Sequence, residues 1–174
     1  MNRKSIATDE IERHYSPGCM VGDIAPLLSR YTTESQRVRD RYEAHLITDL
    51  PYGANVEEKL DLFLPATPVN PEKIPLLMFA HGGYWQQLSK NDHSFLATAW
   101  TAMGYAFASI NYGLAPTSNI PQMISRCLPP INWLGEKYFH YGLDKSCIHA
   151  MLHSAVAHPL PFPTSTRTQH HPPP

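Results

Sequence analysis

The sequence predicts an α/β protein with a mostly parallel sheet, an antiparallel N-terminal start and helices on both faces of the sheet. Three apolar runs, at residues 74–80, 105–113 and 146–153, are suited to strands buried on both faces. Helical segments separate these runs, and this alternation of strands and helices is the signature of a parallel sheet. Two earlier segments, 44–53 and 56–65, alternate apolar and polar residues, which favours a half-exposed antiparallel pair.

The first helix of the parallel region lies before residue 105. Asn91 or Asp92 can cap its N-terminus, and Gly104 stands where a C-terminal cap belongs. A charged segment at residues 33–43 predicts a further helix on the surface. The acidic residues beside the second strand are expected on a solvated face; they are Glu57, Glu58 and Asp61.

The second helix of this region can start at Ser118 or Asn119, but its pattern runs through Pro129 and Pro130. An interior proline removes a hydrogen bond and clashes with the preceding turn, at a cost of about 3 kcal/mol. We therefore expect the helix to be kinked or split there, unless the sequence has drifted from one that once worked.

Composition and charge narrow the class of protein. The 174 residues suffice for one domain with a hydrophobic core. The net charge of −1 does not indicate the positive surface that binds nucleic acid or an anionic membrane. The N-terminus has no signal-peptide pattern, and the longest apolar run is too short to span a bilayer. The three cysteines, Cys19, Cys127 and Cys147, lack metal-ligand spacing. These features predict a cytoplasmic protein without membrane or nucleic-acid partners.

A glycine pair ends the first buried strand in the stretch LMFAHGGYWQQLSK. Without a Cβ, Gly82 and Gly83 can aim bare N–H groups at an oxygen on which negative charge develops during acyl transfer. A tight turn with a packing role is the alternative. Tyr84 and Trp85 could wall an acyl or aryl pocket, or belong to the core. His81 is expected to support the glycine loop.

A serine follows the third buried strand in the stretch MLHSAVAH. Ser154 stands between an apolar strand and a possible helix start, which is the context of a nucleophile elbow. In such a turn the N–H of the next residue, Ala155, completes the oxyanion hole. A serine that caps a helix is the alternative. Tyr112 is expected in the core or in a pocket wall.

These motifs resemble the kynurenine formamidase (arylformamidase) group of α/β hydrolases, over about residues 10–158. The resemblance rests on HGGYWQQLSKNDHSFLA, SINYGLAP and YGLD…IHAMLHSAVAH. It implies a partial α/β-hydrolase fold and hydrolysis of small-molecule carboxylic esters or aryl formamides, with no metal or cofactor. It also implies Ser154 as the nucleophile, with Gly82, Gly83 and Ala155 as the oxyanion hole.

Two departures from the family pattern predict weak or absent activity. Leu152 and Val156 occupy the glycine positions of Gly-x-Ser-x-Gly, where side chains should strain the turn or displace Ser154. The twenty residues after the serine contain no Asp or Glu, and neither His158 nor the histidines at 170–171 would be a base held by an acid. The family order places that acid and base downstream of the serine.

The C-terminal segment, residues 159–174, has six prolines and no periodicity, which predicts a disordered tail after a domain at residues 1–158. Because the domain stops after a strand, and because it resembles the α/β hydrolases, we expect this chain to be a truncated hydrolase. Its open sheet edge would allow self-association, so a non-catalytic binding module is the alternative function. A metal site is a third possibility, but His149 and His153 on one strand would be about 13 Å apart.

Overall fold

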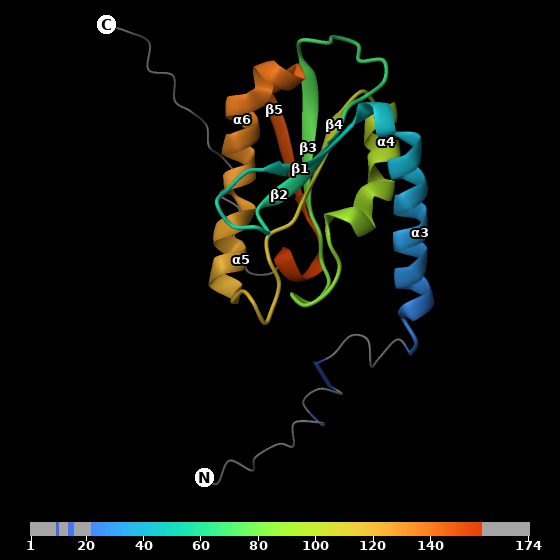
Figure 1. Cartoon of the computed structure of the whole chain (residues 1–174), viewed down its shortest axis with the longest axis vertical. Coiled ribbons are helices and arrows are strands. Elements are labelled where there is room, and N and C mark those ends of the chain that lie inside the picture. The colour runs from blue at the N-terminus through green and yellow to red at the C-terminus, as the bar shows by residue number, and fades with distance from the viewer. Residues whose placement is uncertain (1–9, 11–13, 16–21, 158–174) are drawn as a thin grey trace, which may run out of the picture.

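The computed structural model describes residue 10, residues 14 and 15, and residues 22–157 (Figure 1). The predicted tail at 159–174 and His158 lie outside these residues. The described part contains a five-stranded sheet of order β1-β2-β4-β3-β5. The strands are β1 (Leu46–Pro51), β2 (Lys59–Phe63), β3 (Ile74–Ala80), β4 (Ala106–Ile110) and β5 (Leu143–Leu152).

The sheet is mixed in the way that the sequence predicts. β2 is antiparallel to both of its neighbours, β1 and β4, whereas β3 is parallel to both β4 and β5. β2 is therefore the one described strand that runs against the others. The predicted α/β class, with an antiparallel start that leads into a parallel sheet, is confirmed.

Helices cover both faces of the sheet (Figure 1). On one face, Leu76 and Met78 pack in a core with residues of the helices after β4; on the other, Leu77 and Phe79 pack with residues of the helices that precede β1 and β4. No helix within residues 22–157 is long and apolar enough to cross a membrane. The helical elements are α3 (Ala25–Arg41), η1 (Glu43–His45), η2 (Lys90–Leu96), α4 (Ala97–Ala102), α5 (Ile120–Cys127), α6 (Pro129–Tyr141) and η3 (Ser154–Val156).

The helix predicted across the two prolines is split. Asn119 caps α5, and its side chain forms a reciprocal capping box with Gln122. α5 ends before Leu128, and Pro129 and Pro130 take the first positions of α6. A proline is tolerated there because the N–H that it lacks would have no partner within the helix.

The other helices differ from prediction at their N-termini. The segment after β3 is capped by Ser89, whose hydroxyl accepts from the N–H of Asn91, so the prediction of a cap at Asn91 or Asp92 is wrong. It begins as the 3-10 helix η2 before it continues as α4, and Gly104 follows α4 with a left-handed φ of 84°. The surface helix α3 is longer than the charged segment that predicted it.

Asp61 is fully buried, so its predicted place on a solvated face is wrong. Its carboxylate lies 2.5 Å from a guanidinium nitrogen of Arg39 and 2.7 Å from Nζ of Lys90. It also accepts from the backbone N–H of Asp49 at 2.8 Å. β2 lies between β1 and β4, so both of its faces are inside the protein. The polar positions of its alternating pattern therefore face the helical layer and not solvent. Arg39 of α3 and Lys90 of η2 compensate the charge of the carboxylate there.

We expect Asp61→Ala to lower the free energy of unfolding by about 3–5 kcal/mol, because Arg39 and Lys90 would lose the carboxylate that compensates them. Urea unfolding followed by circular dichroism measures this change. Glu57→Ala removes the same charge from an exposed position and should change stability by less than about 0.5 kcal/mol. Equal effects of the two substitutions would show that the buried network does not stabilise the fold.

Candidate active site

The C-terminal ends of β3 and β5 meet at one edge of the sheet. The parallel register pairs Ala80 with Leu152, and the N–H of His153 donates to the carbonyl of Ala80 at 3.1 Å. The loop that follows β3 and the turn that follows β5 therefore start side by side. In open α/β sheets this edge is where ligands usually bind.

Gly82 lies directly against Ser154. A Cβ built on Gly82 would be 2.8 Å from Cβ of Ser154, 2.8 Å from Nδ1 of His153 and 3.1 Å from the His153 carbonyl oxygen. The contact leaves no room for a side chain at position 82. The structure thus brings together the glycine loop and the serine that the sequence singled out.

Ser154 occupies a sharp turn between a strand and a helix. Its φ is 54°, a left-handed value that is uncommon for a residue with a Cβ. β5 ends two residues earlier, and the 3-10 helix η3 starts at Ser154 itself, with His153 as its N-cap and no side-chain cap. The alternative of a capping serine is therefore wrong. Ser154 is exposed, and its hydroxyl makes no hydrogen bond with any residue in the described part of the chain.

The side chains at the two expected glycine positions pack into the core. Val156 is 3% exposed, and Leu152 is half-buried against the same apolar cluster beneath α5 and α6. Ser154 nevertheless lies against Gly82. The backbone of Ser154 is strained, because its φ is left-handed although the residue has a Cβ. Ala155, the next residue, is buried at 8% exposure.

The loop after β3 is a run of left-handed residues. Gly83 has a φ of 113°, and a Cβ on it would be 2.0 Å from the carbonyl oxygen of Gln87. Tyr84, Trp85 and Leu88 have φ values of 54°, 60° and 70°. The Gly83 carbonyl accepts from the N–H of Gln87 at 2.9 Å, which closes the loop on itself. Glycine is required at position 83 for both conformation and space.

The two aromatic residues of this loop face different surroundings. Tyr84 is 43% exposed, and its hydroxyl donates to the carbonyl of Tyr15 at 3.1 Å. Trp85 is half-buried against the apolar cluster, and its carbonyl accepts from the N–H of Ala115 at 2.8 Å. The two rings are 5.7 Å apart. Both residues directly follow the glycine pair, at the start of the loop.

His81 and Tyr112 lie buried beneath the loop. The hydroxyl of Tyr112 donates to the His81 carbonyl at 2.7 Å, and Nδ1 of His81 is 2.7 Å from the Gly82 carbonyl oxygen. Since a carbonyl can only accept, Nδ1 carries the hydrogen. Burial lowers the pKa of His81 to about 4, so the ring is neutral at pH 7.

A second buried histidine, His93, is expected from the sequence only to help start a helix. The ring of His93 stacks on His81 at 5.8 Å and lies 6.2 Å from the ring of His153. Burial lowers its pKa as well, and its Nε2 has no hydrogen-bond partner among the described residues. Within the searched part of the chain, no three His, Cys, Asp or Glu side chains are grouped so that they could hold a metal ion. His93 lies within the stretch HGGYWQQLSKNDHSFLA, but the sequence does not indicate its burial, because its ring neighbours include residues of other elements.

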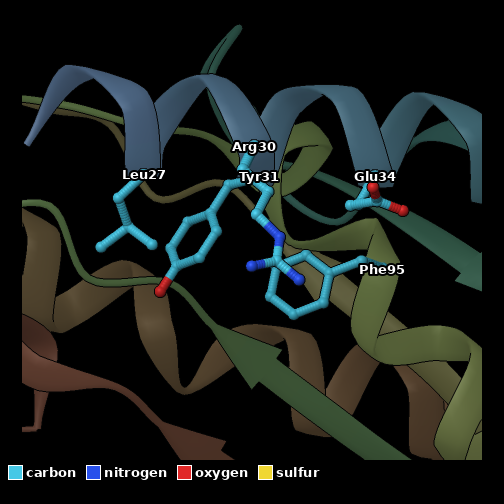
Figure 2. A pocket seen from close by; sticks show the side chains of 5 residues that line it. All are labelled: Leu27, Arg30, Tyr31, Glu34 and Phe95. Carbon is cyan, nitrogen blue, oxygen red and sulfur yellow. The ribbon is translucent and has the colours of Figure 1, made fainter.

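A hollow of about 220 Å³ elsewhere in the structure does not belong to this site. Figure 2 shows the side chains that line it. It lies between α3 and η2, with Tyr31 and Phe95 as its aromatic walls. Its remaining lining residues are Leu27, Arg30 and Glu34. None of the predicted site residues lines it.

Comparison with known proteins identifies the family. The sequence profile of the BD-FAE family matches residues 60–167, which is more than half of the chain. The chain therefore belongs to the BD-FAE family. The resemblance to α/β hydrolases of the arylformamidase-like group is also confirmed, since kynurenine formamidases and esterases are among its relatives and structural neighbours.

Several relatives and solved structures are similar along most of this chain. Kynurenine formamidase from Danio rerio is 33% identical over 159 residues, which are 89% of this chain and 52% of that protein. The Salmo salar enzyme is 30% identical over the same shares. A crystal structure from a Silicibacter species, described as a candidate thioesterase, is 26% identical, with a TM-score of 0.72 over 84% of this chain and 52% of that one.

Esterase B from Lactobacillus rhamnosis shows the same fold, with 23% identity and a TM-score of 0.60 over 78% of this chain and 46% of that one. The described sheet with its helices is thus a partial α/β-hydrolase fold. The chain spans about half the length of the curated relatives that it matches.

We expect Gly82→Ala to destabilise the protein by about 1–3 kcal/mol, because the new methyl group would overlap Ser154. Gly135→Ala is the matched control. In the interior of α6 its methyl would meet only Ile148, at 3.9 Å, and should stabilise by up to about 1 kcal/mol. Thermal unfolding of both variants measures the difference. A neutral or stabilising Gly82→Ala would contradict the contact between the loop and the serine turn.

Proposed function

We propose that this chain carries the nucleophile and oxyanion hole of a serine hydrolase that acts on carboxylic esters or aryl formamides. The observation that supports this most strongly is the contact between Gly82 and a left-handed Ser154 at the ends of two adjacent parallel strands. A strained strand-to-helix turn that exposes a serine beside a glycine loop is the arrangement that acyl transfer requires. Residues 1–158 would form the N-terminal part of the hydrolase domain.

The proposed reaction begins when Oγ of Ser154 attacks the substrate carbonyl. Negative charge then develops on the carbonyl oxygen, and the N–H groups of Gly82, Gly83 and Ala155 would stabilise it. One such donor contributes about 3–4 kcal/mol to transition-state stability in other hydrolases. The C–O or C–N bond of the substrate then breaks, and the leaving alcohol or arylamine takes up the proton that the serine has lost. Water hydrolyses the acyl-serine, which releases the acid and restores the serine hydroxyl. Nothing in this scheme requires a metal or cofactor.

Tyr84 and Trp85 directly follow the glycine pair and are the proposed pocket residues for an acyl or aryl substrate. Planar rings beside a reacting carbonyl can pack against an aromatic leaving group. Kynurenine formamidase relatives at about 30% identity favour an aryl formamide among the possible substrates. We assign the activity to the cytoplasm, in line with the charge and cysteine content of the chain.

We propose that turnover by this chain is weak. Proton removal from a serine needs a base within hydrogen-bond reach. Among residues 22–157 no imidazole bonds to the hydroxyl of Ser154, and His81 already uses Nδ1 on the glycine loop. The oxyanion hole and substrate binding can still give some rate enhancement without a complete triad.

A fluorophosphonate probe tests the proposed nucleophile. We expect slow labelling at Ser154, detected by peptide mass spectrometry, and no labelling in Ser154→Ala. Ser146→Ala, which removes an exposed serine of the preceding strand β5, should leave labelling unchanged. Turnover of p-nitrophenyl acetate should stay near background. Labelling that survives Ser154→Ala would rule out this nucleophile, and a fast Ser154-dependent turnover would show that the proposal of weak activity is wrong.

A second candidate function is a non-catalytic module that binds a partner or itself through β5. This strand is last in the sheet order, and in the described part of the chain it pairs only with β3. Alternate residues of this ten-residue strand therefore offer their N–H and C=O groups on the outer side. Such an edge is a template for the addition of another strand.

Sedimentation velocity over a range of concentrations tests this second function. If β5 pairs with a second copy, the protein should associate as concentration rises, and Ala150→Lys on the exposed face of β5 should oppose it. Met103→Lys adds the same charge at an exposed position after α4 and should have no effect. A monomer at every concentration, or equal effects of the two lysines, would exclude self-association through β5.

A further inference from the structure

Two buried side chains bind two successive carbonyl groups of the glycine loop. Tyr112 binds the carbonyl of His81, and the ring of His81 binds the carbonyl of Gly82. We propose that Tyr112 and His81 are positioning residues that set the directions of the Gly82 and Gly83 N–H groups. The inference rests on the proposed function, in which these two groups stabilise the oxyanion.

The first peptide plane contains the carbonyl of His81 and the N–H of Gly82. A trans peptide is planar, so its C=O and N–H point in opposite directions. The hydroxyl of Tyr112 lies 2.7 Å from the His81 oxygen and is fully buried. It therefore fixes this plane with the Gly82 N–H directed away from the phenol.

The second peptide plane contains the carbonyl of Gly82 and the N–H of Gly83. Its oxygen lies 2.7 Å from Nδ1 of His81, which donates to it. By the same planarity, the Gly83 N–H points away from the imidazole. A glycine loop would otherwise be free to rotate these planes, because glycine populates a wide range of φ and ψ.

The two anchors support each other. The rings of His81 and Tyr112 are 4.8 Å apart, and the ring of His93 also stacks on His81, at an angle of 15° between the ring planes. His81 is 1% exposed, so water does not compete for Nδ1. Because donors that are already oriented need no reorganisation during the reaction, such a clamp would make the amides effective.

The test measures the NMR signals and hydrogen-exchange rates of the Gly82 and Gly83 amides, and does not depend on hydrolytic activity. The chain has nine glycines, so ¹⁵N-glycine labelling gives a spectrum in which the signals of Gly82 and Gly83 can be assigned. We expect Tyr112→Phe to shift the Gly82 amide signal and raise its hydrogen-exchange rate about fivefold or more. His81→Phe should do the same to Gly83.

Tyr52→Phe is the matched control. Tyr52 is also a buried tyrosine whose hydroxyl donates to a backbone carbonyl, but its acceptor is Asn111, outside the loop. This variant should leave both glycine signals unchanged. If Tyr112→Phe and His81→Phe disturb Gly82 and Gly83 no more than Tyr52→Phe does, the positioning role is wrong.

The unmodified protein provides a second measurement in case a variant does not fold. Long-range ¹H–¹⁵N spectra of ¹⁵N-histidine-labelled protein report which ring nitrogen carries hydrogen. His81 should be the Nδ1–H tautomer at pH 7. An Nε2–H tautomer would overturn the proposal, because an unprotonated Nδ1 cannot donate to the Gly82 carbonyl.

Labelling by the fluorophosphonate separates this inference from the proposed function. If the amides act as oxyanion donors, Tyr112→Phe and His81→Phe should slow labelling at Ser154 about a hundredfold, and Tyr52→Phe should not. Disturbed amides with unchanged labelling would support the positioning role and overturn the oxyanion role. Undisturbed amides with slowed labelling would overturn the positioning role.

Discussion

The candidate site depends on the parallel pairing of β3 with β5. That pairing puts the ends of both strands at one edge, and the hydrogen bond from His153 to Ala80 carries the ladder to the residue before the serine. Gly82 and Ser154 then come into contact although 72 positions separate them in the sequence. The antiparallel strands β1 and β2 lie at the other side of the sheet and contribute nothing to this contact.

Backbone strain gathers where the two turns meet. Tyr84, Trp85 and Ser154 all have left-handed φ values, each of which costs free energy for a residue with a Cβ. The surrounding structure holds the loop at both ends. His81 is fixed at its start, and at its end Lys90 binds the buried carboxylate of Asp61. Strain that is maintained in this way is common at sites that bind or react.

The sequence predicts a helix or strand well where residues close together in the sequence determine its type and its ends. The apolar run at 74–80 coincides with β3, since the proline-rich loop before it and the glycines after it leave no other boundary. The strand before Ser154 and the turn at that residue are likewise predicted from local context, whereas the role of Ser154 as a nucleophile stays a prediction. Asp61 could not be placed, because its partners Arg39 and Lys90 are far away in sequence and an alternating strand pattern assigns an acid to solvent. The support of the glycine loop by Tyr112 likewise depends on tertiary contact.

The central claim is that the glycine loop and the serine turn touch across the ends of β3 and β5. Nuclear Overhauser spectroscopy on the whole chain tests it directly. The α-protons of Gly82 should show strong cross-peaks to the β-protons of Ser154, because a methyl group does not fit between them. If the Ser154 β-protons instead show cross-peaks only to residues of another strand, or none to the glycine loop, the account of this site is wrong.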